Sequence, residues 1–265
     1  MLEANAHNYL KKLYQKNLPL WPHSLTLTRL IARSLRRRDK TLIHLSSDSR
    51  NCWWAGLLIP ICLESNNIVL VLSAKLQRQI IEFELPRLRA CGLNCDYVEG
   101  IRQTSAENKI WFMNHKNLCV AYENDSLRNS QVIIPEAEFL SSKLRESISI
   151  KITPKDWENL IKFYPGFESS IINIHKRLTR RLFSQAVCND AAIRVDSSDI
   201  QLLQDVLRNE LPFPIPWNKV FRSTSHDWVS WAQVNKKALT WDWNFQPLNP
   251  LKDLSGLWSS QAHIM

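Results

Sequence analysis

Glycine is scarce in this sequence: the chain has 5 glycines in 265 residues. That is about 2%, against about 7% in typical proteins. Glycine lets the backbone adopt positive φ angles and approach a ligand closely. A glycine-poor chain therefore has few segments that can wrap around phosphate groups.

Long apolar runs are also missing. No run reaches the roughly 18 residues that a membrane-spanning helix needs. The first residues, MLEANAHNYLKKLYQK, lack the apolar core of a signal peptide. We expect a cytoplasmic protein with no membrane partner. The composition, 45% hydrophobic and 22% charged, is ordinary for a globular protein and excludes disorder throughout.

Metal-binding patterns are absent as well. The cysteines show no repeated CxxC, and the seven histidines show no paired ligand spacing. We expect no metal site, no iron–sulfur cluster and no disulfide framework. The six cysteines, expected as reduced core thiols, are Cys52, Cys62, Cys91, Cys95, Cys119 and Cys188.

Positive charge is concentrated near the start of the chain. Residues 1–45 hold nine Lys and Arg against two acidic residues, which gives +7 of the net +9. A concentrated basic segment is typical of a polyanion partner, because bound cations release counterions from a phosphate backbone. The alternative is a solvated helix end, where the helix dipole favours cations. The candidate nucleic-acid-binding residues are Arg36, Arg37, Arg38 and Lys40.

Strand and helix patterns alternate over residues 20–140. This alternation predicts an α/β fold with a parallel sheet flanked by helices. The predicted helices are 24–38 with Ser24 as its cap, 53–63, and 74–90 with a kink at Pro86. The predicted strands are 41–45, 68–73, 95–99, 110–114 and 132–134.

The rest of the chain has a different pattern. Helices are predicted from Thr153-Pro154 onward, at 167–188 and at 197–210, with no strand between them. Two strands follow at 228–234 and 239–245, in a tail rich in tryptophan. On the second strand Leu239, Trp241, Trp243 and Phe245 share one face, which is more typical of a core than of a base-stacking platform. We expect a first domain at 1–150, a helical insertion at 151–216 and a segment at 217–265 that returns to the first domain.

A polar loop separates the first strand from the next helix, which is the layout of a P-loop. A P-loop needs glycines around the phosphates, a lysine for the β- and γ-phosphates and a hydroxyl for Mg²⁺. This loop has no glycine and no lysine. Asp48 would repel a triphosphate, and Arg50 is a bulky substitute for lysine. ATP with Mg²⁺ is possible here but not expected. The loop consists of Ser46, Ser47, Asp48, Ser49, Arg50, Asn51 and Cys52.

Carboxylates follow the strand at 132–134, in the sequence Pro135-Glu136-Ala137-Glu138. In phosphoryl-transfer enzymes such carboxylates hold Mg²⁺ or position an attacking water. Glu136 is the candidate catalytic residue. The alternative is a pair of solvated carboxylates at a strand end.

Taken in order, these segments resemble the N-terminal motor domain of DinG/XPD-type superfamily 2 DNA helicases, in the form found in cyanobacteria. Asn114, His115 and Leu118 are similar to the family's Asn-His-X-X-Leu segment, which adds Asn114 and His115 to the candidate nucleic-acid contacts. The matching segments begin WPHSLTLTRL at 21, GLLIPICLES at 56, IWFMNHKNL at 110, VIIPEAEFL at 132 and TWDWNFQPLN at 240.

The resemblance implies a RecA-like, P-loop-NTPase-type fold, single-stranded or forked DNA as partner, and a role in DNA repair.

The chain also departs from the family pattern at specific positions. The loop at 46–52 lacks the P-loop residues, and Pro135 replaces the aspartate of the family's Asp-Glu-Ala-His. Cys91 and Cys95 alone cannot supply four iron–sulfur ligands. The chain ends at Met265, before a second motor domain. We therefore expect a degenerate, C-terminally truncated helicase half that has lost ATP hydrolysis and cannot unwind DNA alone.

Two alternatives remain. In the first alternative, the chain is the active half of a split ATP-dependent helicase whose second motor domain is encoded separately. Or it is a non-enzymatic adaptor that binds protein through its tryptophan-rich tail, because tryptophan is enriched at interface hot spots.

Overall fold

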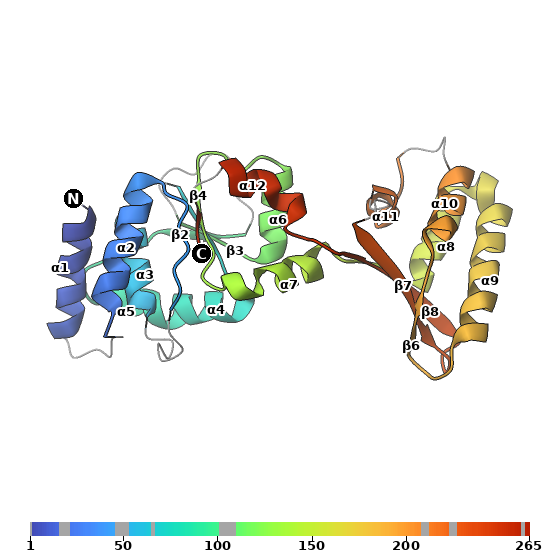
Figure 1. Cartoon of the computed structure of the whole chain (residues 1–265), viewed down its shortest axis with the longest axis horizontal. Coiled ribbons are helices and arrows are strands. Elements are labelled where there is room, and N and C mark those ends of the chain that lie inside the picture. The colour runs from blue at the N-terminus through green and yellow to red at the C-terminus, as the bar shows by residue number, and fades with distance from the viewer. Residues whose placement is uncertain are drawn as a thin grey trace. The chain divides into compact units, whose positions relative to one another are not determined.

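The computed structural model describes residues 2–15, 22–45, 53–64, 67–100, 110–207, 212–222, 227–260 and 263–265. The chain divides into two compact units, one of residues 1–144 and 251–265 and one of residues 145–250 (Figure 1). The division expected from the sequence, at 150 and 216, differs from this one. The reason is that the tryptophan-rich strands pair within the second unit and not with the sheet of the first.

The first unit is built on a parallel sheet in the order β2-β3-β1-β4-β9. Every described pairing in it is parallel. Every residue of β1, β3 and β4 is buried, as expected for strands covered on both faces. The predicted α/β fold with a parallel sheet flanked by helices is confirmed. The strands are β1 (Ile68–Val71), β2 (Tyr97–Glu99), β3 (Ile110–Met113), β4 (Gln131–Ile133) and β9 (His263–Ile264).

Helices α2 and α3 pack closely against each other within this unit. Of the apolar helix α3, Trp54 to Ile61 are all buried, so it is a core element. A Cβ atom at Gly56 would lie 3.0 Å from Leu27 Cδ2 of α2, so glycine permits this close approach. The helices are α1 (Leu2–Gln15), α2 (Ser24–Arg37), α3 (Trp54–Leu63), α4 (Ala74–Gln79), α5 (Leu85–Arg89), α6 (His115–Glu123), α7 (Ala137–Ile148) and α12 (Ser255–Ser260).

Three predicted details of the first unit differ from the structure. His23, not Ser24, precedes α2, and Ser24 is buried within its first turn. The segment 41–45 forms a single parallel bridge, from Thr41 to Ile264, instead of a full strand. The break in 74–90 is a π-helical turn over Ile80–Glu84, just before Pro86. Proline has no N–H to donate to a carbonyl of the preceding turn, so the regular α-helical hydrogen bonding is disturbed there.

The second unit is an antiparallel sheet, in the order β5-β8-β7-β6, with helices α8, α9 and α10 on one side of it (Figure 1). Strand β6 lies between α9 and α10, where the sequence predicted no strand; it is short and only half-buried, so its apolar signal is weak. The elements are β5 (Ile150–Ile152), α8 (Pro154–Phe163), α9 (Glu168–Gln185), β6 (Ala191–Arg194), α10 (Ser197–Val206), α11 (Trp217–Arg222), β7 (Trp228–Asn235) and β8 (Thr240–Pro247).

Aromatic side chains form the core of the second unit. Trp157 of α8 lies with its ring centroid 4.8 Å from that of Trp217 and 6.2 Å from that of Trp243. Trp241 and Trp243 are buried, which confirms their prediction as core residues. Leu239 is not on that face: it is 76% exposed in the β7–β8 turn, with a positive φ of 53°. Trp228 and Trp231, the other two tryptophans of these strands, are only partly buried.

The described helices include none that is both long enough and apolar enough to cross a lipid bilayer.

The imidazole of His175 makes the second unit sensitive to pH. Burial lowers the pKa of His175, whose ring centroid lies 4.9 Å from that of Trp157 and 5.4 Å from that of Trp241. In the window between the lowered folded pKa and the unfolded value near 6.5, the unfolded state binds more protons. Stability therefore falls as the pH falls below about 6.5.

We predict that a His175→Gln variant loses part of this pH dependence, because glutamine does not titrate. The measurement is urea unfolding followed by tryptophan fluorescence at about pH 5 and about pH 7.5, on either side of the ordinary histidine pKa. An equal loss of stability at low pH in wild type and variant would contradict the assignment.

Candidate functional site

The carboxyl edge of the parallel sheet holds the positions that the sequence singled out for nucleotide chemistry. Residues 42–45 lead along the sheet toward the loop 46–52, and α3 begins directly after that loop. Glu136 follows β4 at the same edge, since the segment at 41–45, β9 and β4 run parallel. The seven candidate loop residues, Ser46 to Cys52, lie outside the described residues.

A pocket of about 580 Å³ lies at this edge. Its walls are mainly apolar, and the rings of Trp53 and Trp54 stack there with centroids 4.0 Å apart. The pocket is lined by Leu27, Ile31, Ile43, His44, Leu45, Trp53, Trp54, Leu57, Leu76, Ile133, Ile134, Pro135, Glu136, Glu138, Phe139, Ile264 and Met265.

The described lining of this pocket carries negative side-chain charge. Its described lining contains two carboxylates, Glu136 and Glu138, but no lysine or arginine. Like charges repel more strongly where apolar walls exclude water. Among the described residues, no three His, Cys, Asp or Glu side chains come together as metal ligands. The described lining therefore offers an apolar surface with two carboxylates, the partly exposed Glu136 and the exposed Glu138.

Asn114 and His115 lie at the start of α6, directly after β3. The Asn114 side chain caps the helix: its Oδ1 accepts a hydrogen bond from the backbone N–H of Asn117 at 2.8 Å. Asn114 is exposed, but His115 is buried at 5% exposure. The structure therefore leaves Asn114 accessible to a ligand and places His115 inside the fold.

The predicted basic cluster lies at the end of α2. Arg36, Arg37, Arg38 and Lys40 are all exposed. Arg36 Nε donates to Glu3 Oε1 of α1 at 2.9 Å. A backbone hydrogen bond and then this Arg36 contact lower the pKa of Glu3. Arg37 and Arg38 extend from the last turn, where cations also complement the helix dipole.

The structure does not bring the basic cluster together with Glu136 and Asn114. Residues 36–40 precede the extended segment that starts at Thr41, so they lie at the amino edge of the sheet. Glu136 and Asn114 follow β4 and β3 and lie at the carboxyl edge. The last turn of α2 is tied to the sheet by buried Gln131, whose Nε2 donates to Leu35 O at 3.0 Å.

Solved XPD structures have the same fold. Xpd4 of S. tokodaii matches with a TM-score of 0.55 and 11% identity, over 92% of this chain and 56% of that chain. An XPD structure in the apo form matches with a TM-score of 0.54 and 13% identity, over 90% of this chain and 52% of that chain. The chain has an XPD-like helicase fold. It spans about half the length of these two structures.

The XPD-like fold confirms the fold that the resemblance drawn from the sequence implies, with its parallel sheet flanked by helices. No protein-family model and no curated protein matches the chain. At 11% and 13% identity the likeness describes architecture, since few side chains are shared.

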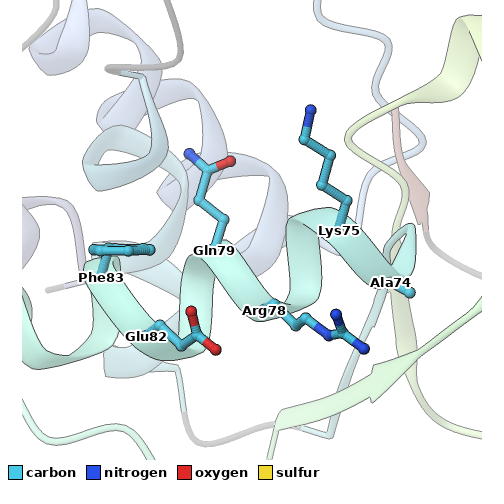
Figure 2. A pocket seen from close by; sticks show the side chains of 6 residues that line it. All are labelled: Ala74, Lys75, Arg78, Gln79, Glu82 and Phe83. Carbon is cyan, nitrogen blue, oxygen red and sulfur yellow. The ribbon is translucent and has the colours of Figure 1, made fainter.

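Two further basic surfaces of this chain, on α9 and on α4, were not predicted from the sequence. Helix α9 presents Lys176, Arg177, Arg180 and Arg181 along one side, at helical spacing that could have revealed them. Arg181 and Arg177 also pair with the buried Asp199 of α10, which gives them a structural role. A shallow surface hollow along α4 displays Lys75 and Arg78, which point to different sides of the helix (Figure 2).

We predict that Gln131→Leu destabilises the first unit by about 0.5–1.5 kcal/mol, because the substitution removes one hydrogen bond to the Leu35 carbonyl, which still accepts from the backbone N–H of Arg38 at 3.2 Å. Urea unfolding of the wild type and the variant measures the change. Gln77→Leu serves as the control, since Gln77 Nε2 bonds Glu99 at an exposed position. Equal, near-zero effects in both variants would show that Gln131 does not hold the end of α2.

Proposed function

We propose that this chain is a helicase-like protein that binds single-stranded or forked DNA and does not hydrolyse ATP efficiently by itself. The basic cluster supports the proposed DNA binding, because four of the five residues 36–40 at the end of α2 are exposed cations. Clustered exposed cations bind phosphate backbones through counterion release, without sequence preference.

The position of the cluster also supports this proposal. Arg36 pairs with Glu3, and all four cations are exposed around the left-handed turn at Arg38. Gln131 fixes this turn to a fully buried strand, so the cations project from a rigid base. Pre-ordered cations lose less conformational entropy on binding than cations on a free chain.

The carboxyl-edge pocket supports the loss of ATP hydrolysis. Pro135 occupies the position where a motor domain of this type carries its metal-holding aspartate, and proline has no side-chain ligand. The described lining supplies two carboxylates and no lysine or arginine, and carboxylates repel phosphate oxygens. Efficient hydrolysis needs positioned Mg²⁺ and charge stabilisation together.

We predict that the double variant Arg37→Gln and Arg38→Gln binds a labelled single-stranded oligonucleotide more weakly than wild type. The logarithmic salt dependence of its affinity should fall by up to about 1.4, since each neutralised phosphate of a single strand contributes about 0.7. Fluorescence anisotropy between about 50 and 200 mM salt measures both effects.

The matched control is Lys75→Gln with Arg78→Gln. These are two exposed cations of the same unit, at the carboxyl edge on α4 (Figure 2). The control should retain wild-type affinity within about twofold, because surface charges farther than a Debye length from the bound strand are screened. Equal losses in both double variants would show non-specific attraction by net charge and contradict a site at the end of α2.

We predict that purified protein shows no DNA-stimulated ATP hydrolysis and that Glu136→Gln leaves the phosphate-release background unchanged. The reason is that Glu136 has no described cation or metal cluster beside it. A coupled phosphate-release assay with and without single-stranded DNA gives the answer. DNA-stimulated turnover that disappears in Glu136→Gln would establish an active motor site and overturn this part of the proposal.

A further inference from the structure

The antiparallel sheet of the second unit has two faces of different chemistry. One face carries Ala232, Val234, Trp241, Trp243 and Phe245, which are buried against the helices of this unit. These helices lie on one side of the strands in Figure 1. Side chains alternate along each strand, so the intervening residues point to the other face. On β7 and β8 these intervening residues are all partly exposed.

A row of four side chains crosses this second face. Strand pairing aligns Lys151 of β5 with Asn244 of β8, Asn244 with Trp231 of β7, and Trp231 with Arg194 of β6. Register partners in an antiparallel pair lie on the same face, with Cβ atoms about 5 Å apart. We name these four residues the cross-sheet row. Trp231 is only partly buried and does not belong to the aromatic core.

The cross-sheet row has the chemistry of a single-strand nucleic-acid surface. An indole on an open sheet face offers a plane on which a base can stack. Arg194 beside it and Lys151, about 10 Å away across two strands, provide cations for flanking phosphates. Both are exposed. Asn244, between Lys151 and Trp231, can donate and accept hydrogen bonds along a base edge.

Within the strands, the acidic residue on this face is Asp242. Lys151 Nζ pairs with Asp242 Oδ2 at 2.9 Å, and the Lys151 side chain remains 58% exposed. Because that contact is exposed, it contributes little energy and a phosphate can compete for the ammonium group. Among the strand residues of this face, two cations lie against one carboxylate, which favours a polyanion over a basic or wholly apolar partner.

We propose that the cross-sheet row is a base-stacking site for single-stranded nucleic acid, in which Trp231 stacks on a base while Arg194 and Lys151 bind the adjoining phosphates. This inference rests on the nucleic-acid binding proposed above. It adds a second surface, which binds by base stacking as well as by charge. The basic cluster of α2 acts through charge alone, whereas the cross-sheet row requires bases.

The test uses the full chain and two probes of equal length and charge: a labelled oligothymidylate and an oligomer of abasic deoxyribose phosphates. Trp231→Ala should weaken binding to oligothymidylate by about 5- to 150-fold, the range for loss of one base–aromatic stack. Its affinity for the abasic probe should stay within about twofold of wild type, because no base is present to stack. Trp231→Phe should restore most of the thymidylate affinity.

Phe163→Ala is the matched control, since Phe163 is an aromatic side chain of the same unit, 51% exposed, on α8. It should bind both probes as wild type does. Circular dichroism and urea unfolding confirm that each variant is folded. Arg194→Gln should weaken binding to both probes, which separates the phosphate contact from the stack.

The outcomes separate this inference from the proposed function. If Trp231→Ala has no effect while Arg37→Gln with Arg38→Gln weakens binding, the cross-sheet row is overturned and the α2 cluster stands. If only the Trp231 variant loses affinity, the row stands and the α2 cluster falls. Failure of the wild type to bind either probe overturns both. A concentration-dependent dimer that Trp231→Ala dissociates would assign the face to a second copy of the chain and overturn the row.

Discussion

The parallel alignment of fully buried strands is the constraint on which the first unit depends. Strands β1, β3 and β4 have no residue facing solvent, so helices must cover both faces of the sheet. Parallel strands also place all their carboxyl ends at one edge. That single rule brings Asn114 and Glu136 to one side of the molecule and puts the cations of residues 36–40 at the other.

The sheet of the second unit is covered by helices on one face only. An antiparallel sheet needs only one covered face, and here the aromatic core around Trp157 covers it. The other face is free to carry polar and charged side chains. A buried charge also holds the helices together, since Asp199 of α10, 3% exposed, is paired with Arg181 of α9. Rigid helices behind the sheet keep its open face ordered, which is what a binding surface requires.

Cysteine chemistry shows how burial decides the behaviour of a residue. Cys62, Cys91 and Cys95 are free thiols in the described core of the first unit. A hydrogen bond with Cys95, together with burial, raises the pKa of Cys62, so this thiol stays protonated and poorly reactive. The absence of paired cysteine motifs in the sequence predicted core thiols. Cys91 and Cys95 are buried and Cys62 and Cys119 are partly buried, but the prediction is wrong for Cys188, which is exposed.

The local helices and strands could be predicted from the amino-acid sequence. Apolar periodicity located α2, α3, α9 and the buried strands to within a few residues, and the run of arginines located the basic cluster. Which strands pair with each other is visible in the folded structure alone. The tryptophan strands join β5 and β6, and Trp231 faces away from Trp241 and Trp243. Strand pairing and register depend on contacts between residues far apart in the chain, and a shift of one residue reverses every face. Local pattern contains no such information.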